Sequence, residues 1–321
     1  MKPGERGTAL LSVLLLVAVM AAISATAMDR LGLATRLAGN AASAAQARQW
    51  LAMAEDLAVS QLEGQAADAG AALNSVLGVE RTIALPDGMA VQATLRDGGN
   101  CFNLNSLVEE RDGGRLIRSR RSIDQFTNLL VLLGLGTGEA RRIAESSADY
   151  IDTDRLPSPF GNERALDSDG VGAVPDRAMV SVTELSRIDG VDADTYRLLQ
   201  PWVCALPDHD LTGLNVETLQ PEQAPLIAML APEQISIGQA HAHLAGRPAS
   251  GYGSVYNFWN DGLLGGVNVS RQATEQLRVD TRFFTLDTAV DTGDLMVRQR
   301  ALIAIEDGHA RRVWRRWGDG A

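Results

Sequence analysis

The chain has 321 residues, a formal net charge of -11 at pH 7 and a hydrophobic content of 45%. This length allows one large domain or two modest ones. The acidic balance argues against a nucleic-acid-binding surface, because binding to phosphates draws its affinity from Lys and Arg. Two Arg-rich runs, at positions 115–121 and 311–316, are interpreted as solvated faces rather than binding patches.

Residues 8–28 form an apolar run without a charged side chain, and Lys2 and Arg6 precede it. A helix of about 20 such residues crosses the hydrocarbon core of a bilayer, and basic residues ahead of it favour a cytoplasmic N-terminus. Three interpretations compete. The run is a secretory signal cleaved after the A-T-A sequence at 25–27, an uncleaved anchor, or a helix that stays on the mature protein after cleavage following Gly7.

The sequence after the apolar run bears on this choice. Residues 31–62 stay rich in Ala, Leu, Gln and Glu and contain no Pro, which favours continuation of the helix. Apolar residues between positions 50 and 62 recur at spacings that place them on one helix face. We therefore predict one long helix from about position 8 to position 62, and this favours cleavage after Gly7 over a signal peptide.

A β-hairpin is predicted directly after this helix. A small, polar connector at 64–74 leads to two β-favouring runs, 76–85 and 89–96, which a Pro-Asp-Gly turn at 86–88 joins. This order of elements indicates a helix whose second half packs on an antiparallel sheet.

Four motifs follow one another through the middle of the chain. They are F-N-L-N at 102–105, an Asp-rich stretch at 150–154, V-T-E-L at 182–185 and L-N-V at 214–216. In this order, and with a short leader ending in Gly before an apolar helix, the chain resembles type II secretion system protein K, the large minor pseudopilin. The resemblance covers essentially the whole chain.

The middle of the chain reads as helical. Residues 122–148 are predicted to form two helices, with Ser122 capping the first. A helix-Gly-helix pattern at 183–203 is similar to the helix-hairpin-helix of some DNA-binding proteins. Because its loop carries three Asp residues, whose charge is wrong for phosphate, we interpret it as structural packing. Further helices are predicted at 232–245 and 270–277.

Residues 251–268 are interpreted as an irregular surface loop whose aromatic side chains offer a contact for a partner. These side chains are Tyr252, Tyr256, Phe258 and Trp259. The preceding His-x-His pair, His241 and His243, is expected on a helix surface rather than in a metal site.

Three C-terminal runs, 282–290, 294–307 and 309–317, are predicted as strands joined by hairpin turns. Strands at both ends with helices between them predict an α+β fold, in which a pilin-like long N-terminal helix packed on an antiparallel sheet is interrupted by a large all-α insertion domain. The resemblance implies the same arrangement. The predicted parts are a prepilin leader (1–7), a transmembrane part of the helix (8–28), a pilin-like domain (29–105 and 275–321) and an inserted helical domain (106–274).

Acidic residues gather between the second predicted helix and Gly170. They are Asp149, Asp152, Asp154, Glu163, Asp167 and Asp169. Carboxylates clustered in a loop suit Ca²⁺, which takes six to eight oxygen ligands. The resemblance also implies calcium in the helical domain, although Tyr150 stands where the family has Trp and Arg164 where it has an acidic residue. The alternative is a solvated acidic loop.

Cys101 and Cys204 are the two cysteines of the chain. If the body of the protein is exported, its compartment is oxidising and a disulfide between them is expected. Two buried thiols are the alternative interpretation.

The sequence contains no recognisable nucleophile motif or phosphate-binding loop, so no catalytic residue is predicted and the chain is not expected to be an enzyme. The resemblance instead implies a structural tip subunit that initiates pseudopilus assembly for protein export across the outer membrane. Its implied partners are the minor pseudopilins I and J, other pseudopilins, the inner-membrane assembly platform and prepilin peptidase, which would cleave between Gly7 and Thr8.

Most pseudopilins carry Glu at the fifth mature position, where it is thought to pair with the N-terminal amine of a neighbouring subunit. Counted from Thr8, that position is Ser12, and a subunit with no neighbour above it does not require the carboxylate. The expected location is the bacterial inner membrane, with one span and the C-terminal body in the periplasm. The alternative is a membrane-anchored or secreted periplasmic enzyme or binding protein with a helical domain.

Overall fold

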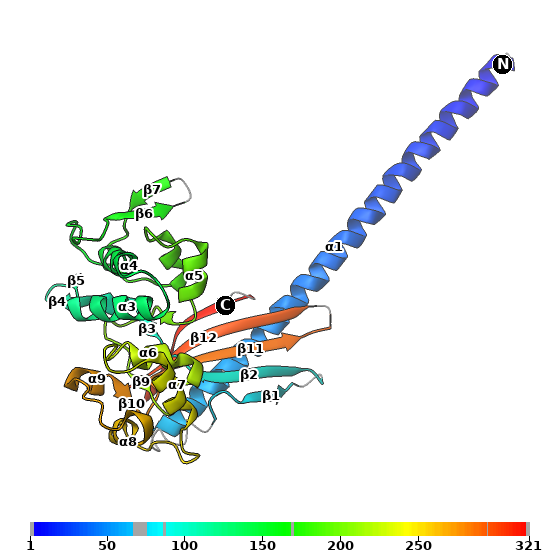
Figure 1. Cartoon of the computed structure of the whole chain (residues 1–321). Helices are drawn as coiled ribbons and strands as arrows, with labels where there is room; N and C mark the ends of the chain where they lie inside the picture. The colour runs from blue at the N-terminus through cyan, green and yellow to red at the C-terminus, as the bar shows by residue number, and fades with distance from the viewer. Residues whose placement is uncertain (1–2, 67–75, 86–87, 168–169, 294, 319–321) are drawn as a thin grey trace.

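The computed structural model describes residues 3–66, 76–85, 88–167, 170–293 and 295–318. A long N-terminal helix packs by its second half on a five-stranded antiparallel sheet, and a mostly helical segment lies between the second and third strands of that sheet (Figure 1). The predicted fold class is therefore confirmed.

Helix α1 (Pro3–Ala66) is slightly longer than predicted and runs without a break. The side chains of residues 10–42 are exposed, and Ala47 is the first buried residue of the helix. From there, Leu51, Ala54 and Leu62 are buried against the sheet. Within the part of the chain that the structure describes, α1 is the one helix long and apolar enough to cross a membrane, judged by length and composition alone.

The sheet has the order β1-β2-β11-β12-β13, and all of its neighbouring strands are antiparallel. Its strands are β1 (Glu80–Ala84), β2 (Ala90–Asp97), β11 (Phe283–Asp291), β12 (Met296–Glu306) and β13 (His309–Trp317). Alternate residues of the strands face α1, as the two-residue period of a strand requires. Val91, Leu286, Val290 and Ile303 pack there against the buried side of the helix.

The segment between β2 and β11 contains short helices and four small two-stranded sheets among its described residues. Its helices are α3 (Arg120–Leu132), α4 (Thr137–Asp149), α5 (Ala193–Leu199), α6 (Ala224–Ala228), α7 (Ile237–Ala245), α8 (Val255–Asn260) and α9 (Arg271–Glu275), with the short 3₁₀ helices η1 (Leu104–Leu107), η2 (Val182–Arg187), η3 (Pro221–Gln223) and η4 (Gly262–Leu264). Its strands are β3 (Phe102–Asn103), β4 (Val108–Arg111), β5 (Arg115–Arg118), β6 (Arg164–Asp167), β7 (Gly170–Ala173), β8 (Val203–Cys204), β9 (Leu214–Asn215) and β10 (Leu277–Arg278). The sequence pattern indicated most of these helices but not α8, which lies in the segment predicted to be an irregular loop, nor the small sheets, which are too short to show a period.

The F-N-L-N motif is a structural junction. Asn103 Oδ1 accepts hydrogen bonds from Leu206 N (3.0 Å) and Asn105 N (3.2 Å), while Asn105 Nδ2 donates to Met179 O (2.9 Å) and Leu206 O (2.7 Å). These buried amides satisfy backbone groups of loops about 75–105 positions further along the chain. The disulfide between Cys101 and Cys204 joins the same two segments, next to the β3–β8 pair.

Three local predictions were wrong. The N-cap of α3 is Ser119 rather than Ser122, whose hydroxyl instead contacts that of Ser119. The aromatic segment does not offer a surface, because Tyr252, Phe258 and Trp259 pack together in the core and only Tyr256 is exposed.

The third concerns the His-x-His pair. His243 is buried and stacks on Tyr252, with ring centroids 5.2 Å apart, although it was expected on the surface of its helix. The cause is the return of residues 251–260 over α7, a long-range contact that the helical period of α7 does not reveal.

Candidate cation site

Two carboxylates are buried where α4 ends. Asp149 is the last residue of the helix and Asp152 lies in the turn that follows, and neither side chain is exposed to solvent. Arg118, from strand β5, reaches both of them. Its Nη1 donates to Asp149 Oδ1 (3.3 Å), and its Nε lies 3.3 Å from Asp152 Oδ2 without the geometry of a hydrogen bond.

The loop after α4 folds back on Asp149. Ser158 donates from its backbone N (2.9 Å) and its hydroxyl (2.6 Å) to the two carboxylate oxygens of Asp149. The backbone of Gly161 approaches so closely that a Cβ there would lie 2.0 Å from Asp149 Oδ2. Glycine is therefore needed at this position for steric reasons, and the approach brings Glu163 to the site.

Asp149, Asp152 and Glu163 form the candidate cation site. One carboxylate oxygen from each lies within 4.8 Å of the others. Both oxygens of Asp152 and both of Glu163 are buried without a hydrogen-bond donor in the part of the chain that the structure describes. Buried polar groups in folded proteins are nearly always paired, so these four oxygens indicate a missing partner of positive charge.

The electrostatics agree with the geometry. Burial, together with the charges of Asp154 and Glu163, raises the pKa of Asp152 to about 8. Burial and the charges of Asp149, Asp154 and Asp176 raise the pKa of Glu163 to about 7. The single guanidinium of Arg118 does not offset three neighbouring carboxylates, whereas a divalent cation would, and oxygen-only ligands suit Ca²⁺ or Mg²⁺.

Among the other predicted ligands, Asp154 is the one whose side chain is described. Asp154 turns one oxygen to Leu156 N (2.8 Å) and is not among the three clustered carboxylates. Asp167 ends strand β6, and its side chain is not described. Asp169 lies outside the described residues.

Two members of the site were not indicated by the sequence pattern. Arg118 belongs to the Arg-rich run interpreted as a solvated face, yet it is the one cation that contacts the clustered carboxylates among the described residues. Asp176, which adopts φ +50° and has a buried Oδ1 without a donor among those residues, adds negative charge beside Glu163. Both lie far from Asp149 in sequence, so only the tertiary fold brings them to the site.

A helix whose first half is exposed and apolar and whose second half packs on an antiparallel sheet defines a pilin-like protein. Residues 100–208 and 214–280 match the two sequence models of the family described as type II secretion system (T2SS), protein K. The chain belongs to this family, whose members are structural pseudopilins, and it therefore has a minor pseudopilin role in type II secretion.

Individual relatives match over most of their length. The chain is 31% identical to type II secretion system protein K of Pectobacterium carotovorum, over 99% of this chain and 98% of that protein. It is 31% identical to the putative type II secretion system protein K of Escherichia coli K12, over 88% of each chain. Its fold is similar to a chain of the GspK-GspI-GspJ complex of enterotoxigenic Escherichia coli, with TM-score 0.67, 27% identity, and coverage of 85% of this chain and 96% of that one.

Proposed function

We propose that this chain is the tip subunit of the pseudopilus, where it initiates assembly in a complex with the minor pseudopilins I and J. The placement of the helical segment carries this proposal. That segment lies on the side of the sheet away from the free half of α1 (Figure 1). If subunits stack with their long helices along the fibre, such a body would obstruct a subunit above it, and an end position has no such subunit.

Two further observations support the proposal. Ser12 lies on the exposed apolar part of α1 and provides no carboxylate for the amine of a neighbouring subunit. The solved structure that this fold resembles is of a complex of three such proteins, GspK, GspI and GspJ. By analogy, the partners of this chain are its own I and J pseudopilins.

The same proposal includes processing and location. Residues 1–7 would be removed by prepilin peptidase, residues 8–28 would cross the inner membrane, and the folded body would lie in the periplasm. The exposed apolar side chains of α1, among them Leu14 and Val17 at 58% and 56% exposure, fit first a bilayer and then the packed helices of a fibre. We further propose that Asp149, Asp152 and Glu163 bind Ca²⁺ as a structural ion.

The mature protein isolated from membranes is expected to begin at Thr8, because cleavage after Gly7 leaves the whole apolar helix on the chain. Intact-mass spectrometry measures this directly. Replacing Gly7 by Val is expected to leave the seven-residue leader in place, whereas Gly4→Val, in the same leader, leaves cleavage unaffected. A mature chain that begins at Met28 or Asp29 would contradict the assignment and revive the secreted alternative.

The tip position predicts one copy at one end of each fibre. An epitope tag inserted between Gly113 and Gly114, in the exposed turn of the β4–β5 hairpin, is expected to bind gold-labelled antibody at fibre ends only. The same tag on the most abundant subunit of the fibre serves as the control and should label the whole shaft. Gold along the shaft with the tag on this chain would show that it is not restricted to the tip.

A further inference from the structure

The two edges of the sheet differ in their protection against strand addition. Edge strand β13 carries four Arg residues, and its pairing with β12 is interrupted at Leu302 and Ile303. Charges and irregularities of this kind discourage another strand from pairing. Strand β1 has a regular five-residue register with β2, no Pro, and only Glu80 and Arg81 as charged residues. Among the described residues, β1 pairs with β2 alone, so its outer backbone edge is open to a partner.

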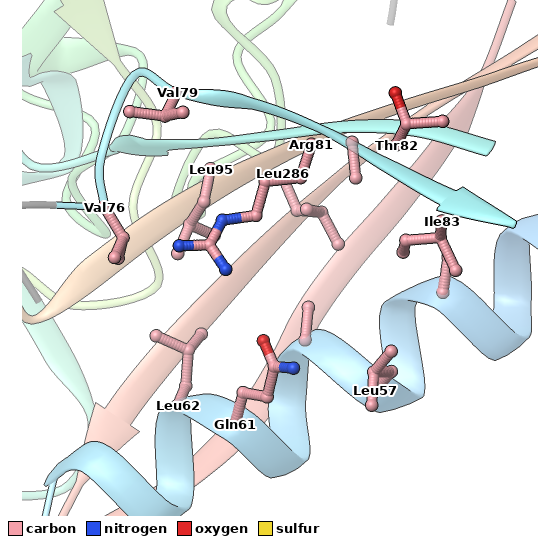
Figure 2. Close-up of a pocket in the computed structure, with 13 residues that line it drawn as sticks. Leu57, Gln61, Leu62, Val76, Val79, Arg81, Thr82, Ile83, Leu95 and Leu286 are labelled. Atoms are coloured by element: carbon pink, nitrogen blue, oxygen red, sulfur yellow. The ribbon is translucent and has the colours of Figure 1, made fainter.

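A groove runs between this open edge and α1 (Figure 2). It has a volume of about 250 Å³, with Leu57 and Leu62 of α1 on one side and Ile83 of β1 and Leu95 of β2 on the other. Gln61 projects from the helix beside these apolar side chains, and Leu57 is 44% exposed although it lies among them. The groove is thus an apolar surface that continues directly from the open edge.

Arg81 gives the groove a charge. It lies opposite Ala93 in the β1–β2 register, on the face that packs on α1, and Figure 2 shows its guanidinium directed from β1 toward Gln61 and Leu62. Within the described ranges, Arg81 makes no ion pair or side-chain hydrogen bond. A cation beside apolar side chains complements a partner segment in which a carboxylate is flanked by apolar residues.

The open edge of β1 selects the conformation of the partner. A strand added beside β1 stays outside the groove and inserts only alternate side chains into it. An added strand would also satisfy the backbone groups of β1, which a helix would not.

We propose that an extended segment of a partner pseudopilin adds as a strand beside β1. This segment carries a carboxylate against Arg81 and, two residues away, an apolar side chain that enters the groove between Ile83 and Leu57. The spacing follows from the two-residue period of a strand. The inference rests on the proposed assembly with the I and J pseudopilins, and it adds the surface and the chemistry of the contact.

The test uses the full-length chain co-expressed with its I and J pseudopilins. A photo-crosslinking amino acid, p-benzoylphenylalanine, replaces Gln61 at the groove or, as the control, Glu63. Glu63 is on the same helix but on the β13 side, where it accepts a hydrogen bond from Ala310 N (3.3 Å). Position 61 is expected to crosslink to a partner segment with an acid-x-apolar or apolar-x-acid pattern, and position 63 is not.

Reversing the charge at position 81 tests whether the crosslink depends on a carboxylate of the partner. Arg81→Glu is expected to lower the crosslink yield from position 61 about tenfold, because like charges then face each other, while Arg81→Lys keeps most of it. If I and J co-purify but position 61 captures no acidic extended segment, or captures it equally with Arg81→Glu, the inference is wrong and the assembly stands. Capture of a helix or of a second copy of this chain also overturns it. Failure of I and J to co-purify overturns both the inference and the proposed assembly.

Discussion

Replacing Glu55 with Ala is expected to lower the free energy of unfolding by about 3 kcal/mol. The Glu55 side chain is 1% exposed between α1 and the sheet. Its carboxylate accepts hydrogen bonds from Arg315 Nε (2.8 Å) and Nη2 (2.9 Å) and from Arg312 Nη1 (2.7 Å). Truncation leaves both guanidiniums without their acceptor. The side chains of Arg315 and Arg312 are 24% and 45% exposed, so water replaces part of the lost hydrogen bonding. We therefore expect a destabilisation at the low end of the range for broken buried ion pairs.

Denaturant unfolding of the full-length chain in detergent measures this effect, and Trp314 and Trp317 of β13 supply a fluorescence signal close to the substitution. Arg311→Ala, in the same strand as Arg312 and Arg315, is the matched control, since it removes an exposed ion pair with Glu306 at the end of β12 and should cost at most about 1 kcal/mol. Replacing Glu55, Arg312 and Arg315 together by Met is expected to recover part of the loss, since no unpaired charge then remains, although the buried amide of Gln299 loses Glu55 as its acceptor. Equal effects of Glu55→Ala and Arg311→Ala would contradict the role of the network.

The same network predicts an acid sensitivity. Burial by itself would raise the pKa of Glu55, but hydrogen bonds and charges from Arg315 and Arg312 outweigh it and hold the pKa below the ordinary value of 4.5. The stabilisation is therefore present above the ordinary pKa and is lost as the pH falls through the lowered pKa of the folded state. The ion pairs of Glu55 with Arg312 and Arg315 therefore stabilise the packing of α1 on β13 throughout the neutral pH range.

The elements with a regular period were predictable from the sequence. The long helix, the β1–β2 hairpin and the three C-terminal strands each show a period of 3.6 or 2, and each lies within a few residues of its predicted range. The two short helices α3 and α4 were predictable for the same reason. Strands β3 to β10 have two to four residues, which is too few to show a period. The pairs β4–β5 and β6–β7 are antiparallel neighbours in the chain, whereas β3–β8 and β9–β10 join segments that only the tertiary fold brings together.

Contacts between distant charged residues were not predictable. Glu55 and Arg312 are separated by 257 positions, and no local pattern marks them as partners. The C-terminal Arg run was accordingly interpreted as solvated, whereas Arg315 and the half-exposed Arg312 both pair with the buried Glu55. Arg316 is also not simply solvated, because it donates a hydrogen bond to Val180 O (2.7 Å) of the helical segment. A charge run shows where cations are concentrated along the chain, whereas the opposing carboxylates are known only from the tertiary structure.

The candidate cation site was predictable in part. The acidic loop suggested oxygen ligands, and two of its members, Asp149 and Asp152, are the buried ones. Which carboxylates converge depends on the close approach of Gly161 to Asp149, because that contact directs the chain back to Glu163. Composition alone does not separate Asp154, which bonds to loop backbone, from Asp152, which has no donor among the described residues.

Removing bound Ca²⁺ is expected to destabilise the protein strongly at pH 8. A ligand that binds only the folded state stabilises it by about 2.7 kcal/mol at a free concentration of 100 times its Kd. For a folded body of this size that corresponds to a fall in Tm of roughly 5–10 °C after EDTA treatment. Calorimetry of the full-length chain in detergent, with EDTA and then with excess Ca²⁺, measures the loss and its recovery.

The effect of Ca²⁺ is expected to grow as the pH rises from about 5 to about 8. In the folded chain without the ion, the raised pKa values of Asp152 (about 8) and Glu163 (about 7) keep protons on these groups. The unfolded chain releases them near pH 3.8 and 4.5, the ordinary pKa values. The folded state therefore loses stability as the pH rises through this window and levels off above about 8. Ca²⁺ replaces those protons, so it stabilises most where they are lost.

Two substitutions decide whether the clustered carboxylates cause this response. Asp152→Asn removes a charge that has no hydrogen-bond donor among the described residues, so it is expected to raise Tm in EDTA at pH 8 and to abolish the increase on adding Ca²⁺. Glu139→Gln removes an exposed carboxylate from the first turn of the same helix, α4, and should leave the Ca²⁺ response intact. If the unsubstituted chain shows no change in Tm between EDTA and excess Ca²⁺ at pH 8, the clustered carboxylates do not bind Ca²⁺. If Asp152→Asn keeps the full response, the ion binds elsewhere, because the loss of a central ligand should weaken binding by tenfold or more.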